Sequence, residues 1–409
     1  MSAVGAYDVV VIGAGPSGSI ASALLNRRGW RVLVVEAQRF PRFAVGESLL
    51  AHCLDFVQEA GMLEALEAHG FQYKDGAAFV RGSQYADVTF ADQYSSGFDH
   101  AFQVDRASFD KLLADQAAQQ GVEIRYETRV IAFDNSDARP RLTIRDASGK
   151  EERIETSFVL DASGFARVLP KLLSLESPSP FPIRTALVTH VADNAPAGSI
   201  DRQKVHIVVH PQHSDVWYWI IPFPNQRSSI GCVAPPEFMA HYPQPAETRL
   251  KALLAEDPFM SRVLANAQWD SMVRENSGYS ANVRAMYGKG FALLGNAAEF
   301  LDPVFSSGVT IAMRSASVAA AVLDRQLRGN TVDWSQDFEA TMRKGIETFR
   351  VYVEAWYDGR FQKVMFAKQK TPKIRQMINS ILAGYAWDET NPFVAEPAKR
   401  LNMVADLCG

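Results

Sequence analysis

The stretch VVVIGAGPSG at residues 9–18 constrains the fold of this chain more than any other feature. Its four β-branched residues, 9–12, are typical of a strand buried on both faces. They run directly into the sequence G-x-G-x-x-G, which predicts a tight turn from a strand into a helix. A strand, a glycine-rich turn and a helix in that order begin a βαβ unit that binds a dinucleotide. The sequence therefore predicts a parallel α/β fold.

The residues of this turn have separate reasons to be there. Gly13 permits the tight turn, Gly15 lets the backbone approach a pyrophosphate, and Gly18 lets the helix pack on the strand. The helix then starts near Pro16 and Ser17, where its first N–H groups and its dipole favour a phosphate. We expect all five residues to bind the cofactor.

Glu36 is the second part of this fingerprint. It ends the apolar run 32–35 and stands 18 positions after Gly18. That is close to the spacing at which a carboxylate binds the ribose hydroxyls of an ADP group. A structural turn without a nucleotide is the alternative, and the fingerprint alone leaves open which dinucleotide binds.

Composition excludes several classes of function. A net charge of -4 provides no basic surface for nucleic acid or an anionic membrane. No apolar run reaches the roughly 18 residues of a membrane span, and the first strand begins too early to leave room for a signal peptide. The three cysteines, Cys53, Cys232 and Cys408, have no metal-binding spacing. We therefore expect a cytoplasmic protein with reduced thiols and no metal.

The segment after Glu36 reads PRFAVGES at residues 41–48. It resembles the P-R-x-x-V-G-E-S segment that runs beside the flavin in the flavin-dependent halogenases. The resemblance implies that Gly46, Glu47 and Ser48 contact the flavin. The alternative is a solvated loop that leads into a helix capped by Ser48.

Lys74 lies in the sequence FQYKDGAAF, in which Asp75-Gly76 is typical of a turn between two strands. By residue type alone, Lys74 would be a surface lysine. Halogenases of this family carry their essential lysine in a similar K-x-G-x-x-F setting, so the resemblance implies that Lys74 is catalytic. A lysine in an apolar tunnel can hydrogen-bond hypohalous acid or form a chloramine, and desolvation eases its deprotonation.

Two further segments resemble the flavin domain of these enzymes. QVDRASFDKLL, which starts at Gln103, looks like a helix start shared by flavoprotein monooxygenases, halogenases and geranylgeranyl reductases. It implies that Gln103 and Arg106 face FAD, with the guanidinium near the ribityl and pyrophosphate oxygens. A solvent-facing helix start is the alternative. The D-A-S-G segment at Asp161 implies close approach to the cofactor, and Phe165 stands where many relatives have an arginine.

Strand-like alternation between residues 183 and 235 contains the sequence WYWIIP. The alternation places Trp217, Trp219 and Ile221 on one face of a strand. Two tryptophans in the core of a sheet would explain the pattern from the residues alone. The sequence also matches W-x-W-x-I-P, the signature of the flavin-dependent halogenases. The resemblance implies that the indoles lie beside the flavin and suppress direct oxygenation of the substrate.

The segment at residues 291–309 reads FALLGNAAEFLDPVFSSGV. It resembles a flavin-binding turn that has the sequence G-D-A-A-x-F-x-D-P-x-x-S-x-G in the halogenases. It implies that Gly295, Asn296, Asp302 and Pro303 contact FAD. Asn296 stands where aspartate is usual. Since an amide can still hydrogen-bond a ribityl hydroxyl, we expect FAD binding to survive.

The end of the same segment differs from the tryptophan halogenases, which have a glutamate before the serine. Here Phe305 precedes Ser306, as in relatives that act on phenols or on pyrroles tethered to carrier proteins. The resemblance implies a catalytic role for Ser306. The N–H groups of Ser307 and Gly308, at a helix start, would hold the halide.

The resemblance covers most of the chain and implies an FAD-binding, Rossmann-like α/β fold of the GR2-type flavoprotein monooxygenases. An inserted β-sheet substrate domain and a helical C-terminal segment that covers the active site complete the expected architecture. Residues 122–158 should form a small meander of strands. The expected boundaries are 1–180 and 275–330 for the FAD-binding domain, 181–274 for the substrate sheet and 331–409 for the helical segment.

The function that the resemblance implies is that of an FADH2-dependent halogenase of secondary metabolism. In that family a flavin hydroperoxide reacts with chloride or bromide, and the lysine delivers hypohalous acid to an electron-rich phenolic or pyrrolic ring. The substrate is free or tethered to an acyl carrier protein. Because the chain has no second glycine fingerprint for NAD(P)H, we expect a separate flavin reductase. The alternatives are an FAD-dependent hydroxylase or desaturase and a catalytically silent flavin-binding accessory protein.

Overall fold

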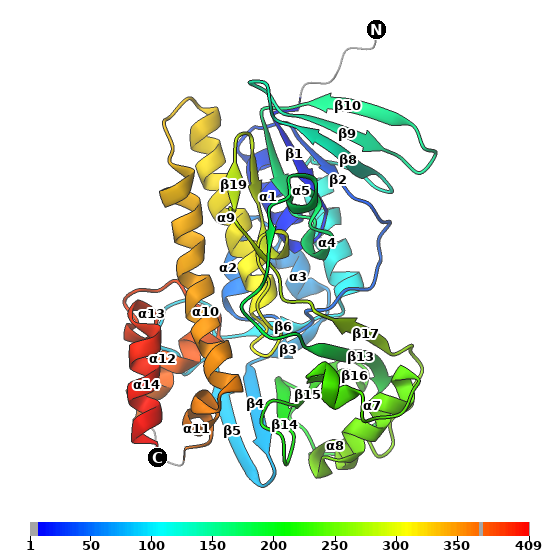
Figure 1. Ribbon diagram of the computed structural model, residues 1–409, viewed down its shortest axis with the longest axis vertical. Coiled ribbons are helices and arrows are strands. Elements are labelled where there is room, and N and C mark those ends of the chain that lie inside the picture. The colour runs from blue at the N-terminus through cyan, green and yellow to red at the C-terminus, as the bar shows by residue number, and fades with distance from the viewer. Residues whose placement is uncertain (1–6, 368–370, 409) are drawn as a thin grey trace.

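The computed structural model describes residues 7–367 and 371–408 of the chain. A six-stranded sheet lies in the upper half of the molecule and a seven-stranded sheet in the lower half, with a long helix along one side (Figure 1). In the described part of the chain, the helices are too short or too polar to cross a membrane.

The six-stranded sheet follows from the glycine fingerprint. Its strands, in the order in which they pair, are β19 (Tyr287–Gly288), β20 (Phe291–Leu293), β11 (Phe158–Asp161), β1 (Val9–Ile12), β2 (Val32–Val35) and β7 (Glu123–Arg125). All pair in parallel except β19, and β1 is buried along its whole length. The predicted buried strand is therefore confirmed.

Three helices pack beside this sheet. They are α1 (Pro16–Arg27), α4 (Arg106–Gln119) and α9 (Ser307–Leu327), and α1 contacts both of the others. Proline suits the first position of α1 because its missing N–H would have no helical partner there. Helix α9, which begins about 300 residues after β1, thus packs beside the first βα unit. This packing connects the glycine fingerprint to the segment that contains Asn296.

The predicted meander is confirmed in part. Strands β8 (Arg129–Asp134), β9 (Arg141–Arg145) and β10 (Glu151–Glu155) form an antiparallel three-stranded sheet. The first strand of the predicted segment, β7, instead pairs with β2 at the edge of the six-stranded sheet.

The seven-stranded sheet carries the tryptophan pair. Its strands, in pairing order, are β17 (Arg274–Ser277), β13 (Thr185–Ala192), β16 (Arg227–Ala234), β15 (Trp217–Phe223), β14 (Lys204–Val209), β4 (Gly76–Arg81) and β5 (Gln84–Thr89). Only β14 and β4 pair in parallel. Strands β4 and β5 come from the segment 1–180 that the sequence assigns to the FAD-binding domain.

Short helices cover one face of this sheet, namely α6 (Pro236–Met239), α7 (Ala246–Ala255) and α8 (Pro258–Val263). Tyr218 and Ile220 pack in a core with the leucines of α7, whereas Trp217 and Ile221 belong to the main core on the other face. The alternation predicted for this strand is therefore confirmed.

Two local expectations are met only in part. Asp75-Gly76 lies between two strands, as expected, but β3 (Gln72–Lys74) pairs with β6 (Ala101–Gln103) while β4 enters the seven-stranded sheet, so the two strands do not pair with each other. Ser48 does not cap a helix, because α2 (His52–Glu59) begins later. Ser48 instead forms an isolated bridge with Gln103.

The C-terminal segment is helical, as predicted, and its long helix runs beside both halves of the molecule (Figure 1). The helices are α10 (Thr341–Tyr357), α11 (Arg360–Phe366), α12 (Pro372–Leu382), α13 (Pro392–Ala395) and α14 (Pro397–Leu407). The remaining elements are α3 (Leu63–Ala68), α5 (Val168–Leu172) and the small pair β12 (Glu176–Ser177) and β18 (Asn282–Val283).

Candidate functional site

The glycine turn after β1 has no room for side chains. Gly13 has a φ of +96°, and a Cβ on Gly18 would lie 1.9 Å from the carbonyl oxygen of Gly13. The Gly13 N–H donates to the carbonyl of Val35 at 2.8 Å, which joins the turn to β2. The turn therefore has the close helix–strand packing that a dinucleotide fingerprint needs.

Glu36 is buried and holds this turn. Its Oε2 accepts the N–H of Ala14 at 2.8 Å, and its Oε1 accepts the N–H of Gln38 at 2.9 Å. A carboxylate has about four lone-pair sites, so two accepted hydrogen bonds leave capacity for ribose hydroxyls.

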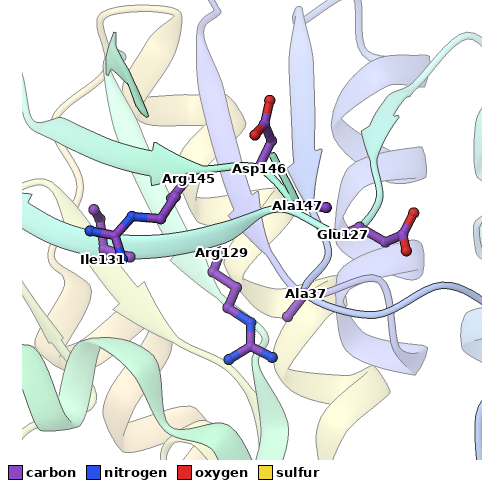
Figure 2. A pocket seen from close by; sticks show the side chains of 7 residues that line it. All are labelled: Ala37, Glu127, Arg129, Ile131, Arg145, Asp146 and Ala147. Carbon is purple, nitrogen blue, oxygen red and sulfur yellow. The ribbon is translucent and has the colours of Figure 1, made fainter. Parts of the chain in front are cut away.

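A charged pocket lies beside Glu36, between the end of β2 and the three-stranded sheet. Figure 2 shows the side chains that line it, among them the guanidinium of Arg129 below Ala37. Its cavity volume is about 270 Å³, and its lining residues are Ala37, Glu127, Arg129, Ile131, Arg145, Asp146 and Ala147. Ala37, the residue after Glu36, connects this pocket to the end of β2.

Two arginines, Arg42 in the loop after β2 and Arg106 at the start of α4, bind the same carboxylate beside the glycine turn. Arg42 forms an ion pair with the buried carboxylate of Asp110 at 3.0 Å, and its Nη2 lies 3.5 Å from the position of a Cβ on Gly15. Arg106 also binds Asp110, through Nε at 2.7 Å and Nη2 at 3.0 Å, and its Nη1 donates to the carbonyl of Val45. The sequence singled out Arg106 but not Arg42, although Arg42 lies in the P-R-x-x-V-G-E-S segment.

Gly46 has a φ of +97°, and a Cβ there would lie 2.9 Å from Nη1 of Arg106. Arg106 thus fixes the loop backbone, since its nitrogens are engaged by Asp110 and the loop carbonyls. Glycine is required here because a side chain would be strained and would displace the guanidinium. A direct contact of Arg106 with FAD stays a prediction.

Glu47 pairs with a residue that the sequence did not reveal. Its buried carboxylate lies 2.5 Å from Nε2 of His190 on β13. Burial disfavours the charged ring, but the hydrogen bond and charge of Glu47 raise the pKa of His190 above its usual value. Asp105 lies close enough to complete a three-residue group, but its carboxylate accepts the N–H groups of Ala107 and Ser108 and thus caps α4. Glu47 and His190 therefore bind each other, and Asp105 binds backbone N–H groups.

Gln103 is fully buried on β6, where it forms a bridge with Ser48 and contacts Arg202 before β14. Its Nε2 donates to the carbonyl of Arg202 at 3.0 Å, and its Oε1 has no partner among the described protein atoms. A free buried acceptor is an unusual feature that a ligand donor would satisfy.

The Asp161 carboxylate serves the backbone. Its Oδ1 accepts the N–H of Ser163 at 2.9 Å and its Oδ2 that of Leu169 at 2.6 Å, while burial raises its pKa. Asp161 therefore shapes the turn that packs against Gly13, where a Cβ would meet the carbonyl oxygen of Ala162 at 2.7 Å. Its contact with FAD stays a prediction.

Arg167 is a further residue that the sequence did not single out. Its guanidinium is buried and donates to the carbonyls of Asn282, Asn296 and Ala298 at 2.7, 3.2 and 3.4 Å. It thereby holds the turn that resembles the flavin-binding segment. Phe165, at the position where relatives have an arginine, is half-exposed and packs edge-on against Phe300.

Gly295 and Asn296 form the turn after β20. Gly295 has a φ of +51°, and a Cβ there would meet Ala312 of α9 at 2.7 Å, so glycine is needed for the close approach. The Oδ1 of Asn296 is buried and has no partner among the described protein atoms. It lies 4.0 Å from the position of a Cβ on Gly308. An unpartnered acceptor at this place fits a ribityl hydroxyl of FAD.

Asp302 is buried in the same segment. Its Oδ1 accepts the N–H of Val304 at 3.0 Å, and its Oδ2 accepts the hydroxyl of Tyr357 at 2.9 Å. Burial raises the pKa of Asp302 to about 6. The carbonyl of Pro303 accepts the N–H of Ser306 at 3.0 Å, which closes the turn before α9.

The predicted halide site lies at the start of α9. Ser306 has a φ of +57° and is followed by Ser307 and Gly308, the first two residues of this helix. The first four N–H groups of a helix lack helical acceptors, and the helix dipole favours an anion there. The geometry is therefore suited to an anion, and binding of a halide stays a prediction.

Lys74 is fully buried, although its residue type favours the surface. Its Nζ donates to the carbonyl of Leu49 at 2.6 Å and lies 5.1 Å from the ring centre of Phe90. Desolvation by this burial lowers the pKa of Lys74 to about 7. The thiol of Cys53 interacts electrostatically with Lys74, and its Sγ lies 3.1 Å from Oγ1 of Thr310 in α9. Cys53 thus interacts both with the Lys74 amine and with a residue of the first turn of α9.

The tryptophans lie together on β15, with ring centres 5.9 Å apart. Trp217 is buried and its Nε1 donates to the hydroxyl of Tyr357 at 3.0 Å. Because Tyr357 in turn donates to Asp302, two hydrogen bonds connect Trp217 to the predicted flavin-binding turn. The Nε1 of Trp219 donates to Ser229 at 3.2 Å.

Aromatic side chains of the C-terminal helices surround Phe305. Its ring meets Trp356 and Phe361 edge-on, with centres 5.7 and 5.4 Å apart. Trp356 also packs against Phe79 of β4 at 5.5 Å. Helices α10 and α11 therefore contribute to the wall beside the start of α9, and closure over an active site stays a prediction.

Comparison with known proteins agrees with this geometry. The family described as FAD binding domain matches residues 6–345. The chain is 30% identical over 326 residues to a tryptophan 2-halogenase of Chondromyces crocatus, a match that covers 78% of this chain and 62% of the relative. It is 27% identical over 403 residues to a 1H-pyrrole-2-carbonyl-[peptidyl-carrier protein] chlorinase of Pseudomonas fluorescens, covering 92% and 89%.

Solved structures share the whole fold. A flavoprotein/dehydrogenase from Cytophaga hutchinsonii is 42% identical, with a TM-score of 0.95 and 98% of each chain covered. The flavin-dependent halogenase CmlS is 27% identical, with a TM-score of 0.77, over 98% of this chain and 76% of that one. These comparisons confirm the predicted FAD-binding α/β fold. The unpartnered Oδ1 of Asn296 and the glycine turn after β1 fit FAD. The chain belongs to the FAD-binding-domain flavoproteins, in the group that contains the flavin-dependent halogenases.

Proposed function

We propose that this protein is an FADH2-dependent halogenase that uses dioxygen and chloride or bromide to halogenate an electron-rich phenolic or pyrrolic ring. The observation that carries the proposal is the buried amine of Lys74, whose pKa desolvation lowers to about 7. An amine of this kind is rare unless a function requires it, because burial of an ammonium without a carboxylate partner is unfavourable.

Reduced FAD, dioxygen and halide together supply the hypohalous acid in this scheme. Residues 13–18 and Glu36 would bind the ADP part, and the free acceptors of Gln103 and Asn296 would receive hydroxyls of the cofactor. The N–H groups of Ser307 and Gly308 would hold the halide. Ser306, in its left-handed conformation, orients these N–H groups through the turn.

Lys74 then acts at Nζ. The protonated amine donates a hydrogen bond to hypohalous acid. The neutral amine can instead take the halogen as a haloamine, in which case the oxygen–halogen bond breaks, the nitrogen–halogen bond forms and the hydroxyl leaves as water with one proton of the amine. With a pKa of about 7, both forms are populated near neutral pH. The surrounding Phe90 ring and the buried carbonyl of Leu49 exclude water, which would otherwise compete with the aromatic substrate.

Trp217 and Trp219 separate the flavin side of the site from the substrate in this proposal. Tyr357 and Asp302 fix the orientation of the Trp217 indole through two hydrogen bonds. The match to a pyrrolyl-carrier-protein chlorinase, together with Phe305 in place of the glutamate of tryptophan halogenases, favours a carrier-tethered or phenolic substrate. A separate flavin reductase would supply reduced FAD.

The test is to supply chemically reduced FAD, air and halide to the full chain with free phenols, free pyrroles and a pyrrolyl-loaded carrier protein. We expect a product with the isotope pattern of the added halogen, which is lost in Lys74→Ala while oxygen consumption continues. Unchanged halogenation by Lys74→Ala would refute the role of Lys74.

The second candidate is a flavin oxidoreductase that does not use halide, such as a hydroxylase or desaturase. The structure with 42% identity, described as a flavoprotein/dehydrogenase, favours it. An oxidised product that forms at the same rate with and without halide would support this candidate and contradict halogenation.

A further inference from the structure

Lys204 is a second buried lysine near Lys74, and the proposed chemistry does not use it. It lies at the start of β14 and its side chain is 6% exposed. Its Nζ lies 2.8 Å from Oδ1 of Asp75 and 3.3 Å from Oδ1 of Asp87 on β5. Asp75 is the residue immediately after Lys74. The ion pair of Lys204 with Asp75 therefore fixes the chain next to the residue that carries the candidate catalytic amine.

The backbone around Asp75 is held from both sides. The N–H of Asp75 donates to the carbonyl of Gln203 at 2.9 Å, and the carbonyl of Asp75 accepts the N–H of Phe90 at 2.7 Å. A Cβ on Gly76 would lie 1.8 Å from the carbonyl oxygen of Val88 and 3.2 Å from Nζ of Lys204. Here the chain leaves β3 and enters a different sheet, so the position of Asp75 sets the direction in which Lys74 points.

The charges around the two lysines are also arranged as one group. Desolvation is the largest cause of the lowered pKa of Lys74. Of the smaller electrostatic effects, those of Cys53 of α2 and Asp75 raise this pKa, and that of Lys204 lowers it. The titratable groups that interact with Lys204 are Asp75, Asp87, Tyr85, His206 and Lys74 itself. Lys204 therefore compensates the charge of Asp75, which would otherwise act on Lys74 without a paired cation.

We propose that Lys204, acting through its ion pair with Asp75, is a positioning residue for Lys74 that fixes the strand change and with it the place of the Lys74 amine among the surrounding charges. The proposal rests on the proposed function for the significance of Lys74. Its geometry and its test do not require a substrate.

The test follows the ¹³Cε chemical shift of lysine by NMR against pH in the full chain labelled with [ε-¹³C]lysine. The Lys74 signal is the one absent from Lys74→Arg. We expect Lys204→Met to raise the titration midpoint of Lys74 by roughly one pH unit, because a cation is removed and a carboxylate is released. Asp75→Asn should lower the midpoint, and Lys204→Arg should keep it near that of the original chain.

A matched control is Lys251→Met, which removes an exposed lysine paired with Glu247 on α7 and should leave the midpoint unchanged. A folded Lys204→Met protein with an unaltered midpoint would overturn the proposal, as would shifts of the same sign in Lys204→Met and Asp75→Asn. If Lys204→Met does not fold, a midpoint that stays unaltered in Asp75→Asn overturns it instead.

The failure of the proposed function would look different. In that case no halogenated product forms from the full chain, while the Lys74 titration still responds to Lys204 and Asp75. Where halogenation is observed, its dependence on pH should move with the NMR midpoint in each variant. A lower rate without a moved pH profile would indicate a merely structural role for Lys204.

Discussion

At the scale of single residues, burial changes what a side chain can do more than its residue type does. Lys74 would be an ordinary surface lysine by composition, yet its amine is enclosed and its hydrogen bond is to a backbone carbonyl. The unfolded chain keeps that amine in water, so folding must remove its hydration. The same burial that destabilises the fold gives the amine a pKa of about 7.

Lys74→Met should stabilise the protein, to an extent that depends on pH. Because the folded-state pKa of Lys74 is lowered from 10.5 to about 7, the unfolded state binds the proton more tightly between these values. Stability of the original chain therefore rises with pH across that window, and below about pH 7 the penalty is fully present. We expect the variant to gain about 4 to 5 kcal/mol in free energy of unfolding at about pH 6.

Urea unfolding at a series of pH values measures this gain. It should shrink as the pH rises toward about 10. A gain that stays constant over this range would show that the amine is not the source of the effect.

Asn296→Ala should weaken FAD binding. The unpartnered Oδ1 of Asn296 is the buried acceptor best placed for a ribityl hydroxyl, and a single hydrogen bond is worth about 1 kcal/mol. The Kd for FAD should therefore rise about five- to tenfold, as measured by quenching of flavin fluorescence. Asn330→Ala, at an exposed asparagine after α9, is the control and should leave the Kd unchanged.

At the scale of elements, single side chains join parts of the fold that are distant in the sequence. Tyr357, the last residue of α10, accepts a hydrogen bond from Trp217 of β15 and donates one to Asp302 before α9. Arg184 lies over the Tyr357 ring at 4.1 Å. The C-terminal helices thus fix β15 relative to the turn that contains Asp302.

Tyr357→Phe should destabilise the protein by about 1 to 3 kcal/mol, because it leaves the Trp217 N–H and an Asp302 oxygen buried without this partner. Chemical unfolding measures the change. Tyr85→Phe is the matched control, since the Tyr85 ring is more than half exposed. Equal stability of the two variants would contradict the importance of the hydrogen-bonded chain.

At the scale of the whole molecule, the C-terminal helices are part of the structure and not an appendage. The Ser380 hydroxyl oxygen accepts the N–H groups of Tyr94 and Ser95 at 2.7 and 2.9 Å. The carbonyl of Ala383 accepts the N–H of His52 at the start of α2. A Cβ on Gly97 would overlap the Tyr385 hydroxyl, so this loop is shaped to receive α12 and the turn after it.

A chain that ends at residue 345, where the family match ends, should therefore fail to fold. It would lack Trp356 and Tyr357 and would expose the core around α2 and Phe305. Soluble yield and a cooperative thermal transition are the measurements. A chain that lacks only residues 407–409 is the control, and Leu407 is exposed, so it should melt like the full chain. Cooperative folding of the shorter chain would refute this view.

The predictions from sequence succeeded where the pattern depends on a few neighbouring residues and failed where pairing between distant strands decides the structure. The strand and glycine turn at residues 9–18 and the alternation around Trp217 are confirmed, because both depend on backbone geometry over a few residues. The two strands expected on either side of Asp75-Gly76 are present but belong to different sheets, and the alternative in which Ser48 caps a helix is excluded. Turn and capping residues are only local preferences, and the pairing of β3 with β6 overrides them.

By itself, the sequence determined the dinucleotide fold and the family, because these are written in short motifs whose spacing follows the backbone. Only the tertiary structure decided that Lys74 is buried, that Arg167 holds the Asn296 turn, that Glu47 meets His190, and that Tyr357 connects Trp217 to Asp302. The hydrogen bonds Arg167–Asn296, Glu47–His190 and Trp217–Tyr357 each span more than 100 residues, and Tyr357–Asp302 spans 55. They exist because two sheets and the C-terminal helices pack together, and no local pattern encodes which side chains such packing brings into contact.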